Sequence, residues 1–310
     1  MNTHFHLKLI KEHNVKRFWQ TALTVILLLL SYAVSAKDTL PVTTSFSILG
    51  NLVEAVGGNR VTVSTLVGPN EDAHVFEPTP SDVKKVAQSK LVVANGLGFD
   101  QWLDRLSSAA GYKGEILVAS KGIKTRQMPD KDIVQPDPHA WQDPNNVIIY
   151  VRNIANVLSR LDPKGSLYYK KNCERYVQSL TALDAWAMQQ FMQISMAKRK
   201  VITSHDAFGY FGARYGIEFL APQGITTESE ASAKDVAKLI RKIKHDRIKA
   251  VFIENMSNPK LLQQLSREAD VTVGGKLYAD ALSLPQGPAP TYLKMMRYNV
   301  EQLMMGLKQN

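Results

Sequence analysis

The 310-residue sequence contains a single cysteine, Cys173. One cysteine excludes a disulfide scaffold and every metal site that needs two or more thiolates. The sequence also lacks a Gly-x-x-x-x-Gly-Lys-Ser/Thr loop for nucleotide phosphates and a His-Glu-x-x-His helix of the metalloprotease type. If the chain binds a transition metal, it must therefore use His, Asp and Glu as ligands.

The N-terminal segment has the pattern of a signal peptide. Four basic residues precede a neutral, mostly apolar run over 21–34, which is short for a membrane span and ends in Ala33-Val34-Ser35-Ala36. We expect cleavage after residue 36, although an uncleaved membrane anchor has a related pattern. Since no cysteine lies near the cleavage site, we expect no lipid anchor. The mature chain would begin near Lys37 as a soluble periplasmic protein.

Charge and composition limit the class of protein and the partners that it can bind. With 45% hydrophobic and 21% charged residues, the chain is typical of a globular protein. Loss of the leader removes four basic residues and Glu12, so the net charge falls from +10 to +7. A bias this mild predicts no nucleic-acid partner. Four histidines remain after cleavage: His74, His139, His205 and His245.

From residue 40 onward, short β-branched runs alternate with helical patterns. The expected strands are Val61–Val67, Leu91–Ala94, Ile116–Ala119, Val201–Thr203, Ile217–Leu220, Ala250–Ile253 and Val271–Val273. Helices are expected from Pro80, from Phe99 to Ala110, from Pro144, and over Ser166–Met196, Ala207–Tyr215, Ser232–Asp246, Pro259–Ala269 and Thr291–Leu307. Strands separated by helices of this length predict mostly parallel sheets covered on both faces.

The helical segment from Ser166 to about Met196 contains no internal proline or glycine and is too long for an ordinary crossover. The predicted fold class is therefore α/β, with two Rossmann-like lobes, each a mostly parallel sheet flanked by helices, joined by one long rigid connecting helix. The expected organisation is a signal peptide at 1–36, an N-terminal lobe at 37–162, a connecting helix at 163–197 and a C-terminal lobe at 198–310.

Four side chains with metal-binding chemistry fall in predicted loops. His74 follows a strand, His139 precedes a helix, His205 ends the strand that opens the second lobe, and Asp280 follows that lobe's last strand. Parallel sheets place ligand sites at the carboxyl ends of their strands, so two ligands from each lobe would meet in the cleft. Each histidine alone could instead be satisfied by a loop hydrogen bond.

Carboxylates near these histidines are candidates for fixing the imidazole tautomers. Asp72, Asp206, Glu228 and Glu230 lie in the same segments. Each could equally be an ordinary helix cap or a surface carboxylate.

The surrounding motifs resemble the periplasmic solute-binding proteins of ABC transporters for zinc and manganese (cluster A-I, ZnuA-like). The resemblance covers essentially the whole mature chain and keeps the order of its motifs. It includes the His74 loop with Glu77–Asp82, Val93–Leu103, Asp137–Trp141, His205–Phe211, Glu228–Ser232 and Asp280.

The resemblance implies that His74, His139, His205 and Asp280 bind one metal ion between the two lobes. It also implies that the loaded protein docks on a membrane permease powered by a separate ATPase subunit. A monomeric, non-enzymatic capture protein in the periplasm is the expected form.

Zn²⁺ is the expected ion, because three imidazoles and one carboxylate make a closed, near-tetrahedral site. In manganese-type members the third ligand is commonly Glu, where this sequence has His205. The connection Ile123–Pro138 lacks the histidine-rich insert of many zinc-specific relatives, and Asp100 stands where glutamate is usual. A manganese or mixed Mn/Zn/Fe capture protein of the same family is therefore the alternative.

A zinc-dependent hydrolase or lyase is a third reading, since three histidines with an open position also form catalytic sites. Asp280 separates the two readings, because a fourth protein ligand leaves no position for an activated water. The sequence accordingly favours a protein without catalytic residues.

Overall fold

The computed structural model describes residues 39–130, 133–228 and 231–310. The chain divides into two units, 1–39 and 40–310, and the second contains every helix and strand given below. The predicted signal peptide lies outside the described residues. Among the described helices, none is both long enough and apolar enough to cross a membrane.

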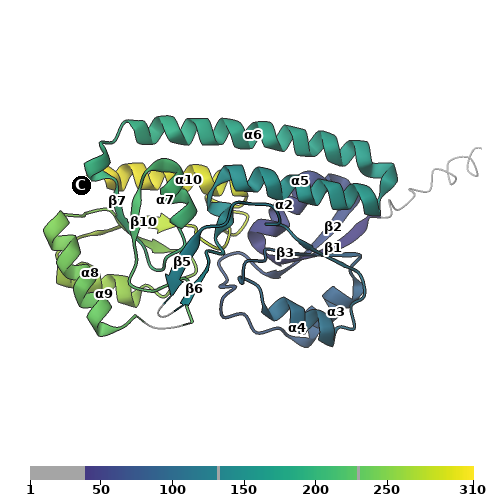
Figure 1. Cartoon of the computed structure of the whole chain (residues 1–310), viewed down its shortest axis with the longest axis horizontal. Coiled ribbons are helices and arrows are strands. Elements are labelled where there is room, and N and C mark those ends of the chain that lie inside the picture. The colour runs from purple at the N-terminus through teal and green to yellow at the C-terminus, as the bar shows by residue number, and fades with distance from the viewer. Residues whose placement is uncertain (1–38, 131–132, 229–230) are drawn as a thin grey trace, which may run out of the picture. The chain divides into compact units, whose positions relative to one another are not determined.

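The first sheet has the strand order β2-β1-β3-β4, and every neighbouring pair is parallel. Helices α2 and α5 lie on one side of it and α3 and α4 on the other (Figure 1). Residues 40–161, which include this sheet, are called the N-lobe. Its main elements are β1 Leu40–Phe46, α2 Ser47–Gly57, β2 Val61–Val67, α3 Pro80–Gln88, β3 Leu91–Ala94, α4 Trp102–Ala109, β4 Glu115–Val118 and α5 Pro144–Leu161.

The second sheet repeats the arrangement with the order β10-β9-β7-β8, again all parallel. Helices α8 and α9 pack together on one side, and α10 packs against β10 and β7. Residues 200–307 are called the C-lobe. Its elements are β7 Lys200–Ile202, α7 Gly209–Tyr215, β8 Glu218–Leu220, α8 Ala233–Asp246, β9 Val251–Glu254, α9 Lys260–Ala269, β10 Val273–Leu277 and α10 Tyr292–Leu307.

The predicted fold class is confirmed: two parallel four-stranded sheets flanked by helices, with one long helix between them in the chain. That helix is α6, Ser166–Met192. The domain boundaries expected from the sequence stay a prediction.

Local sequence explains where two of the helices, α3 and α5, begin. Pro80 opens α3 behind a capping box of Thr79 and Asp82, and Asp143 caps α5 by accepting a hydrogen bond from the Asn145 N–H.

Two parts of the fold differ from the sequence expectation. The final strand was expected at 271–273, but β10 begins only at Val273 and runs through Gly274 and Gly275 to Leu277. These glycines do not break the strand. A Cβ atom at Gly275 would collide with Gln302 of α10, and one at Gly274 would crowd Phe252, so glycine permits close packing there. The sequence reading also missed β1 and the antiparallel hairpin of β5 Gln127–Asp130 and β6 Ile133–Pro136.

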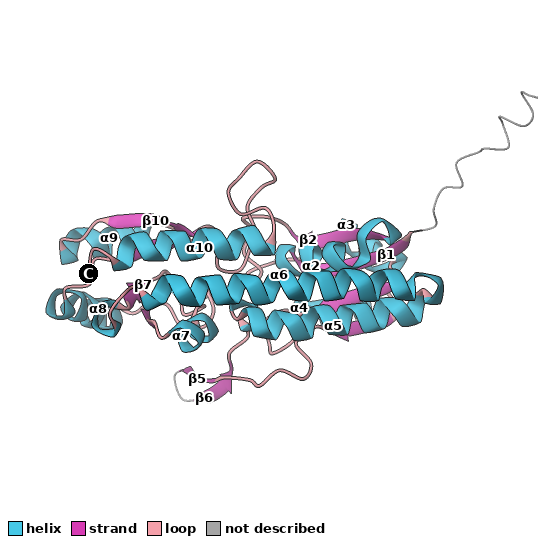
Figure 2. Ribbon diagram, turned by 90° about the horizontal axis from the view of Figure 1, so that it is seen from above, coloured by secondary structure: helices cyan, strands magenta, loops and turns pink. Residues whose placement is uncertain are grey.

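Helix α6 is bound to both lobes (Figure 2). On the N-lobe side, the Asn172 side-chain amide donates to the Val56 carbonyl at 2.9 Å. On the C-lobe side, Asp184 accepts from the Arg214 guanidinium at 2.9 Å and from the Tyr215 hydroxyl at 3.0 Å. Helix α6 is therefore hydrogen-bonded to α2 in the N-lobe and to α7 in the C-lobe.

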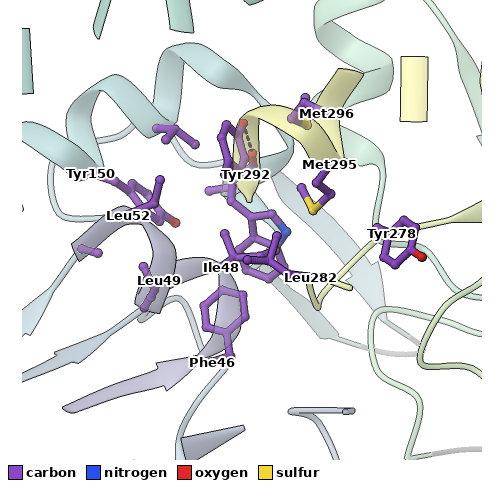
Figure 3. Close-up of a cluster of buried hydrophobic side chains, with 14 of the residues drawn as sticks. Phe46, Ile48, Leu49, Leu52, Tyr150, Tyr278, Leu282, Tyr292, Met295 and Met296 are labelled. Carbon is purple, nitrogen blue, oxygen red and sulfur yellow. Dashed lines mark hydrogen bonds between the residues drawn. The ribbon is translucent and has the colours of Figure 1, made fainter. Parts of the chain in front are cut away.

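Apolar packing also continues from one lobe to the other (Figure 3). Phe46 and Leu52 of the N-lobe belong to the same buried cluster as Tyr292, Met295 and Met296 of the C-lobe. A shared core of this kind resists large relative motion of the lobes, because opening it would expose apolar surface to water.

The packing of α6 can be tested with two leucines on the same helix. Leu180 is fully buried, whereas Leu167 is 81% exposed. We expect Leu180→Ala to lower the free energy of unfolding by about 2–5 kcal/mol, because it leaves a cavity in a close-packed core. The matched control Leu167→Ala should change it by less than about 0.5 kcal/mol. Urea unfolding curves measure both, and equal effects of the two substitutions would contradict the packing described here.

Candidate metal centre

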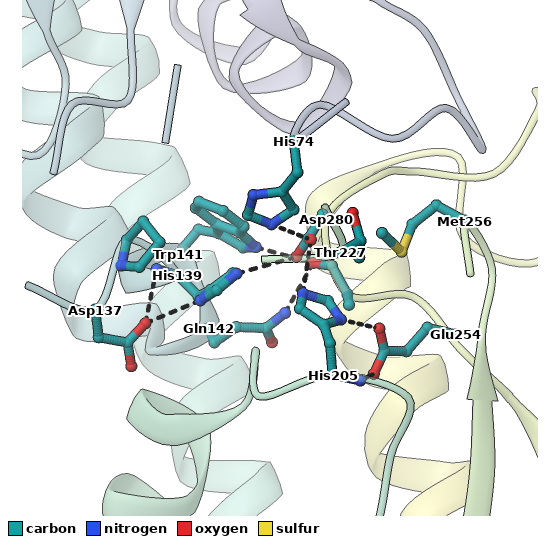
Figure 4. Close-up of polar contacts among 12 residues, drawn as sticks. His74, Asp137, His139, Trp141, Gln142, His205, Thr227, Glu254, Met256 and Asp280 are labelled. Atoms are coloured by element: carbon teal, nitrogen blue, oxygen red, sulfur yellow. Dashed lines mark hydrogen bonds and ion pairs between the residues drawn. The ribbon is translucent and has the colours of Figure 1, made fainter. Parts of the chain in front are cut away.

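Three imidazoles and one carboxylate converge between the lobes (Figure 4). One ligand-type atom from each of His74, His139, His205 and Asp280 lies within 4.8 Å of every other. His74 is 8% exposed, and the other three side chains are shielded almost completely from solvent. The structure thus brings together all four residues that the sequence singled out.

Each residue reaches the centre from the end of a regular element. His74 lies in the loop after β2, His205 follows β7, and Asp280 follows β10. His139 instead follows the hairpin strand β6 and caps the short 3₁₀ helix Ala140–Gln142 before α5. Three of the four positions therefore follow the rule for carboxyl ends of parallel strands, and the fourth depends on the hairpin.

The Nε2 atoms of all three histidines lie close to the Asp280 carboxylate. From the Asp280 carboxylate, the Nε2 atoms of His205, His74 and His139 lie 3.1, 3.3 and 3.9 Å away. Within the described part of the chain, these three Nε2 atoms and both Asp280 oxygens are buried without a hydrogen-bond partner. Buried polar atoms are rarely left unpaired, so five together mark a site that is completed by something else.

The separations fit a small cation at the middle. Two ligands that are each about 2.0–2.1 Å from a tetrahedral metal ion lie about 3.3 Å apart. The separations of 3.1 and 3.3 Å from Asp280 Oδ2 match this spacing, whereas the 3.9 Å between Asp280 Oδ1 and His139 is longer.

Carboxylates fix the orientation of two of the rings. The Nδ1 atom of His139 lies 2.9 Å from the Asp137 carboxylate, which also accepts the His139 backbone N–H at 3.0 Å. The Nδ1 atom of His205 contacts Glu254, whose other oxygen accepts the backbone N–H groups of Ser204 and His205. When Nδ1 of a neutral imidazole donates to a carboxylate, the Nε2 lone pair is free and directed at the centre.

Neither of these carboxylates was among the four that the sequence suggested. Asp72 contacts the backbone of His74 rather than its ring. Among the described residues, Asp206 and Glu228 form no hydrogen bond or ion pair with the three imidazoles, and Glu230 lies outside the described residues. Asp137 stands two residues before His139 in the sequence, and that spacing is the one signal that could have identified it.

The buried charges act strongly on one another. Burial opposes a charged imidazole at His205, but the carboxylates of Glu254 and Asp280 outweigh it and raise the pKa of His205 well above its usual value. Burial likewise opposes a charged Asp280, but His205 and His139 hold the pKa of this carboxyl well below its usual range. The metal-free centre therefore retains a proton on His205 beside an ionised Asp280.

Asp100 supports the centre from further away. Burial raises the pKa of its carboxyl, which accepts the backbone N–H groups of Asn95 at 2.6 Å and Gly96 at 3.0 Å. The Asn95 side chain in turn donates to the carbonyl of Pro138, the residue before His139. The departure from glutamate noted in the sequence thus lies in a turn that positions the His139 segment.

Comparison with known proteins shows which family the chain belongs to. The sequence profile of a family described as "Zinc-uptake complex component A periplasmic" matches residues 42–306. The chain belongs to this family. Its members are non-enzymatic substrate-binding proteins of ABC transporters. The hypothesis of a zinc-dependent hydrolase or lyase is therefore rejected.

Individual relatives differ in the metal that they are named for. The manganese-binding lipoprotein MntA of Halalkalibacterium halodurans is 32% identical over 293 residues, covering 92% of this chain and 97% of that protein. The iron-binding protein YfeA of Yersinia pestis is 29% identical over 270 residues, 86% of each chain. The periplasmic zinc-binding protein TroA of Treponema pallidum has a TM-score of 0.82 at 27% identity, covering 87% of this chain and 99% of that chain.

The electrostatic role of Glu254 gives a direct test. We expect Glu254→Gln to lower the pKa of His205 in the metal-free protein, because the substitution removes a negative charge beside Nδ1 while keeping the side-chain shape. Titration of the ¹⁵N-labelled imidazoles by NMR measures this pKa. Glu268→Gln, on the exposed face of α9, is the control and should leave it unchanged. An unaltered His205 pKa in Glu254→Gln would contradict the assignment.

Proposed function

We propose that this protein captures one Zn²⁺ ion between its two lobes and delivers it to an ABC-type importer. The observation that carries the proposal is the cluster of five buried, unpaired ligand atoms from His74, His139, His205 and Asp280. The ion is the cargo, and no bond of a substrate is made or broken.

The ligand set supports zinc over manganese. Zn²⁺ accepts a four-coordinate site of imidazole and carboxylate, whereas Mn²⁺ prefers more oxygen donors. Here three of the four donors are imidazole nitrogens, and the two carboxylates next to the centre, Asp137 and Glu254, face the Nδ1 side of their rings. Asp280 supplies the single oxygen ligand.

Binding is coupled to a proton. An imidazole must be neutral to bind a metal, so the proton that Glu254 and Asp280 hold on His205 must leave as the ion enters. The divalent charge of the ion then compensates the Asp280 carboxylate. The fourth position is filled by protein, which leaves no site for an activated water.

The partner proposed for the loaded protein is a membrane permease with a separate ATPase subunit. Membership of the family supports this role, and the word "periplasmic" in the family description supports a periplasmic location. The predicted leader over residues 1–36, without a cysteine near its end, supports a soluble periplasmic form.

A manganese or mixed-metal capture protein is the second candidate. It is favoured by the relatives named for manganese and iron, which match 92% and 86% of this chain. The same four residues would bind the ion, and the same transporter role would follow. Only the selectivity would differ.

Metal content and competition test the proposal. After dialysis, elemental analysis of the mature protein should give one equivalent of zinc, which excess Mn²⁺ fails to displace. His205→Ala should lose stoichiometric zinc, because it removes one of four ligands and leaves Glu254 without its partner. His245→Ala is the control, since its side chain is 88% exposed on α8.

Retention of manganese in preference to zinc would keep the capture role and overturn the choice of metal. The absence of any stoichiometric metal from the unmutated protein would contradict the proposed site.

A further inference from the structure

One carboxylate, that of Asp72, bridges the loop that carries His74 and the opposite lobe. One oxygen of Asp72 accepts the backbone N–H of His74 at 2.9 Å. Its other oxygen accepts the hydroxyl of Thr227 at 2.6 Å. Thr227 lies in the C-lobe loop between β8 and α8, and its side chain is close to the ligand cluster (Figure 4). Asp72 therefore connects a ligand of the N-lobe directly to the C-lobe.

The contacts on the Asp280 side of the cluster are of a different kind. The carbonyl of Ala279, next to Asp280, accepts the Trp141 indole N–H at 2.9 Å and the Gln142 amide at 2.8 Å. Both hydrogen bonds are fully buried. Breaking them would leave polar groups unpaired away from water, which is costly. Asp280 is thus held firmly to the N-lobe segment that contains His139.

The Asp72–Thr227 contact is easier to break, because both side chains are only half-buried and water can replace either partner. The remaining bonds between this loop and the C-lobe lie further from the ligand. Asn70 donates its N–H to the Leu282 carbonyl and accepts from Asn255, the latter in an exposed position. Asp72 stands between this anchor and His74.

We propose that Asp72 is a positioning residue that makes the hold of His74 on the ion depend on the Thr227 loop. With Thr227 in place, the carboxylate is fixed and supports the His74 backbone. Without it, the carboxylate can turn to water, and His74 becomes the ligand that leaves first. The inference rests on the proposed function. It adds that the ion leaves from the His74 side of the cluster.

The test compares two adjacent threonines. Thr227→Val removes the hydroxyl at nearly constant shape, and Thr226→Val makes the same change at the neighbouring half-buried position. Each purified protein, loaded with one equivalent of Zn²⁺, is mixed with excess chelator, and the release rate is followed by stopped flow. We expect Thr227→Val to release Zn²⁺ about tenfold faster, the range of one charge-assisted hydrogen bond. Thr226→Val should match the unmutated protein.

A conservative variant separates positioning from general stability. Thr227→Ser retains the hydroxyl and should restore the slow release, while the melting temperature of the metal-free protein stays the same in all variants. Equal release rates in Thr227→Val and the unmutated protein would overturn the role of Asp72. So would a lowered melting temperature of the metal-free protein in Thr227→Val. If the unmutated protein fails to hold one equivalent of Zn²⁺, the proposed function fails instead.

Discussion

The structure depends on one carboxylate, Asp280, which is buried among the Nε2 atoms of three imidazoles. An ionised group in this position is costly unless a positive charge accompanies it. In the metal-free protein that charge is the proton retained on His205. A divalent cation compensates the buried carboxylate more completely than a proton does, because it carries two positive charges.

The two sheets serve to bring the four ligands to one point. The loops after β2, β7 and β10 carry His74, His205 and Asp280 to the ligand cluster. The long helix α6 and the core shared by both lobes then limit how far these strand ends can separate. A nearly preformed site binds with little conformational cost.

Much of this could be predicted from the sequence, because the decisive signals are local. Alternating strands and helices indicated the two parallel sheets, and the uninterrupted run from Ser166 indicated α6. The four ligand residues stand in loops at the ends of elements. The strand β10 was misplaced because its two glycines look like a break, whereas they make room for α10 and Phe252.

The ring partners could not be predicted in the same way. Glu254 is the last residue of β9 and meets His205 because β9 pairs with β7, a contact between segments about fifty residues apart. Such pairing is decided by the packing of the whole sheet. Asp137 depends on the hairpin of β5 and β6, whose short, proline-containing strands resemble a loop. Long-range packing rather than local pattern thus determines how the ligands are oriented.

X-ray absorption at the zinc edge of the loaded protein tests the central claim most directly. The account predicts four ligands at about 2.0–2.1 Å, with scattering from three imidazole rings and one oxygen. A shell of five or six ligands, or one with fewer than three imidazoles, would contradict the closed site formed by His74, His139, His205 and Asp280.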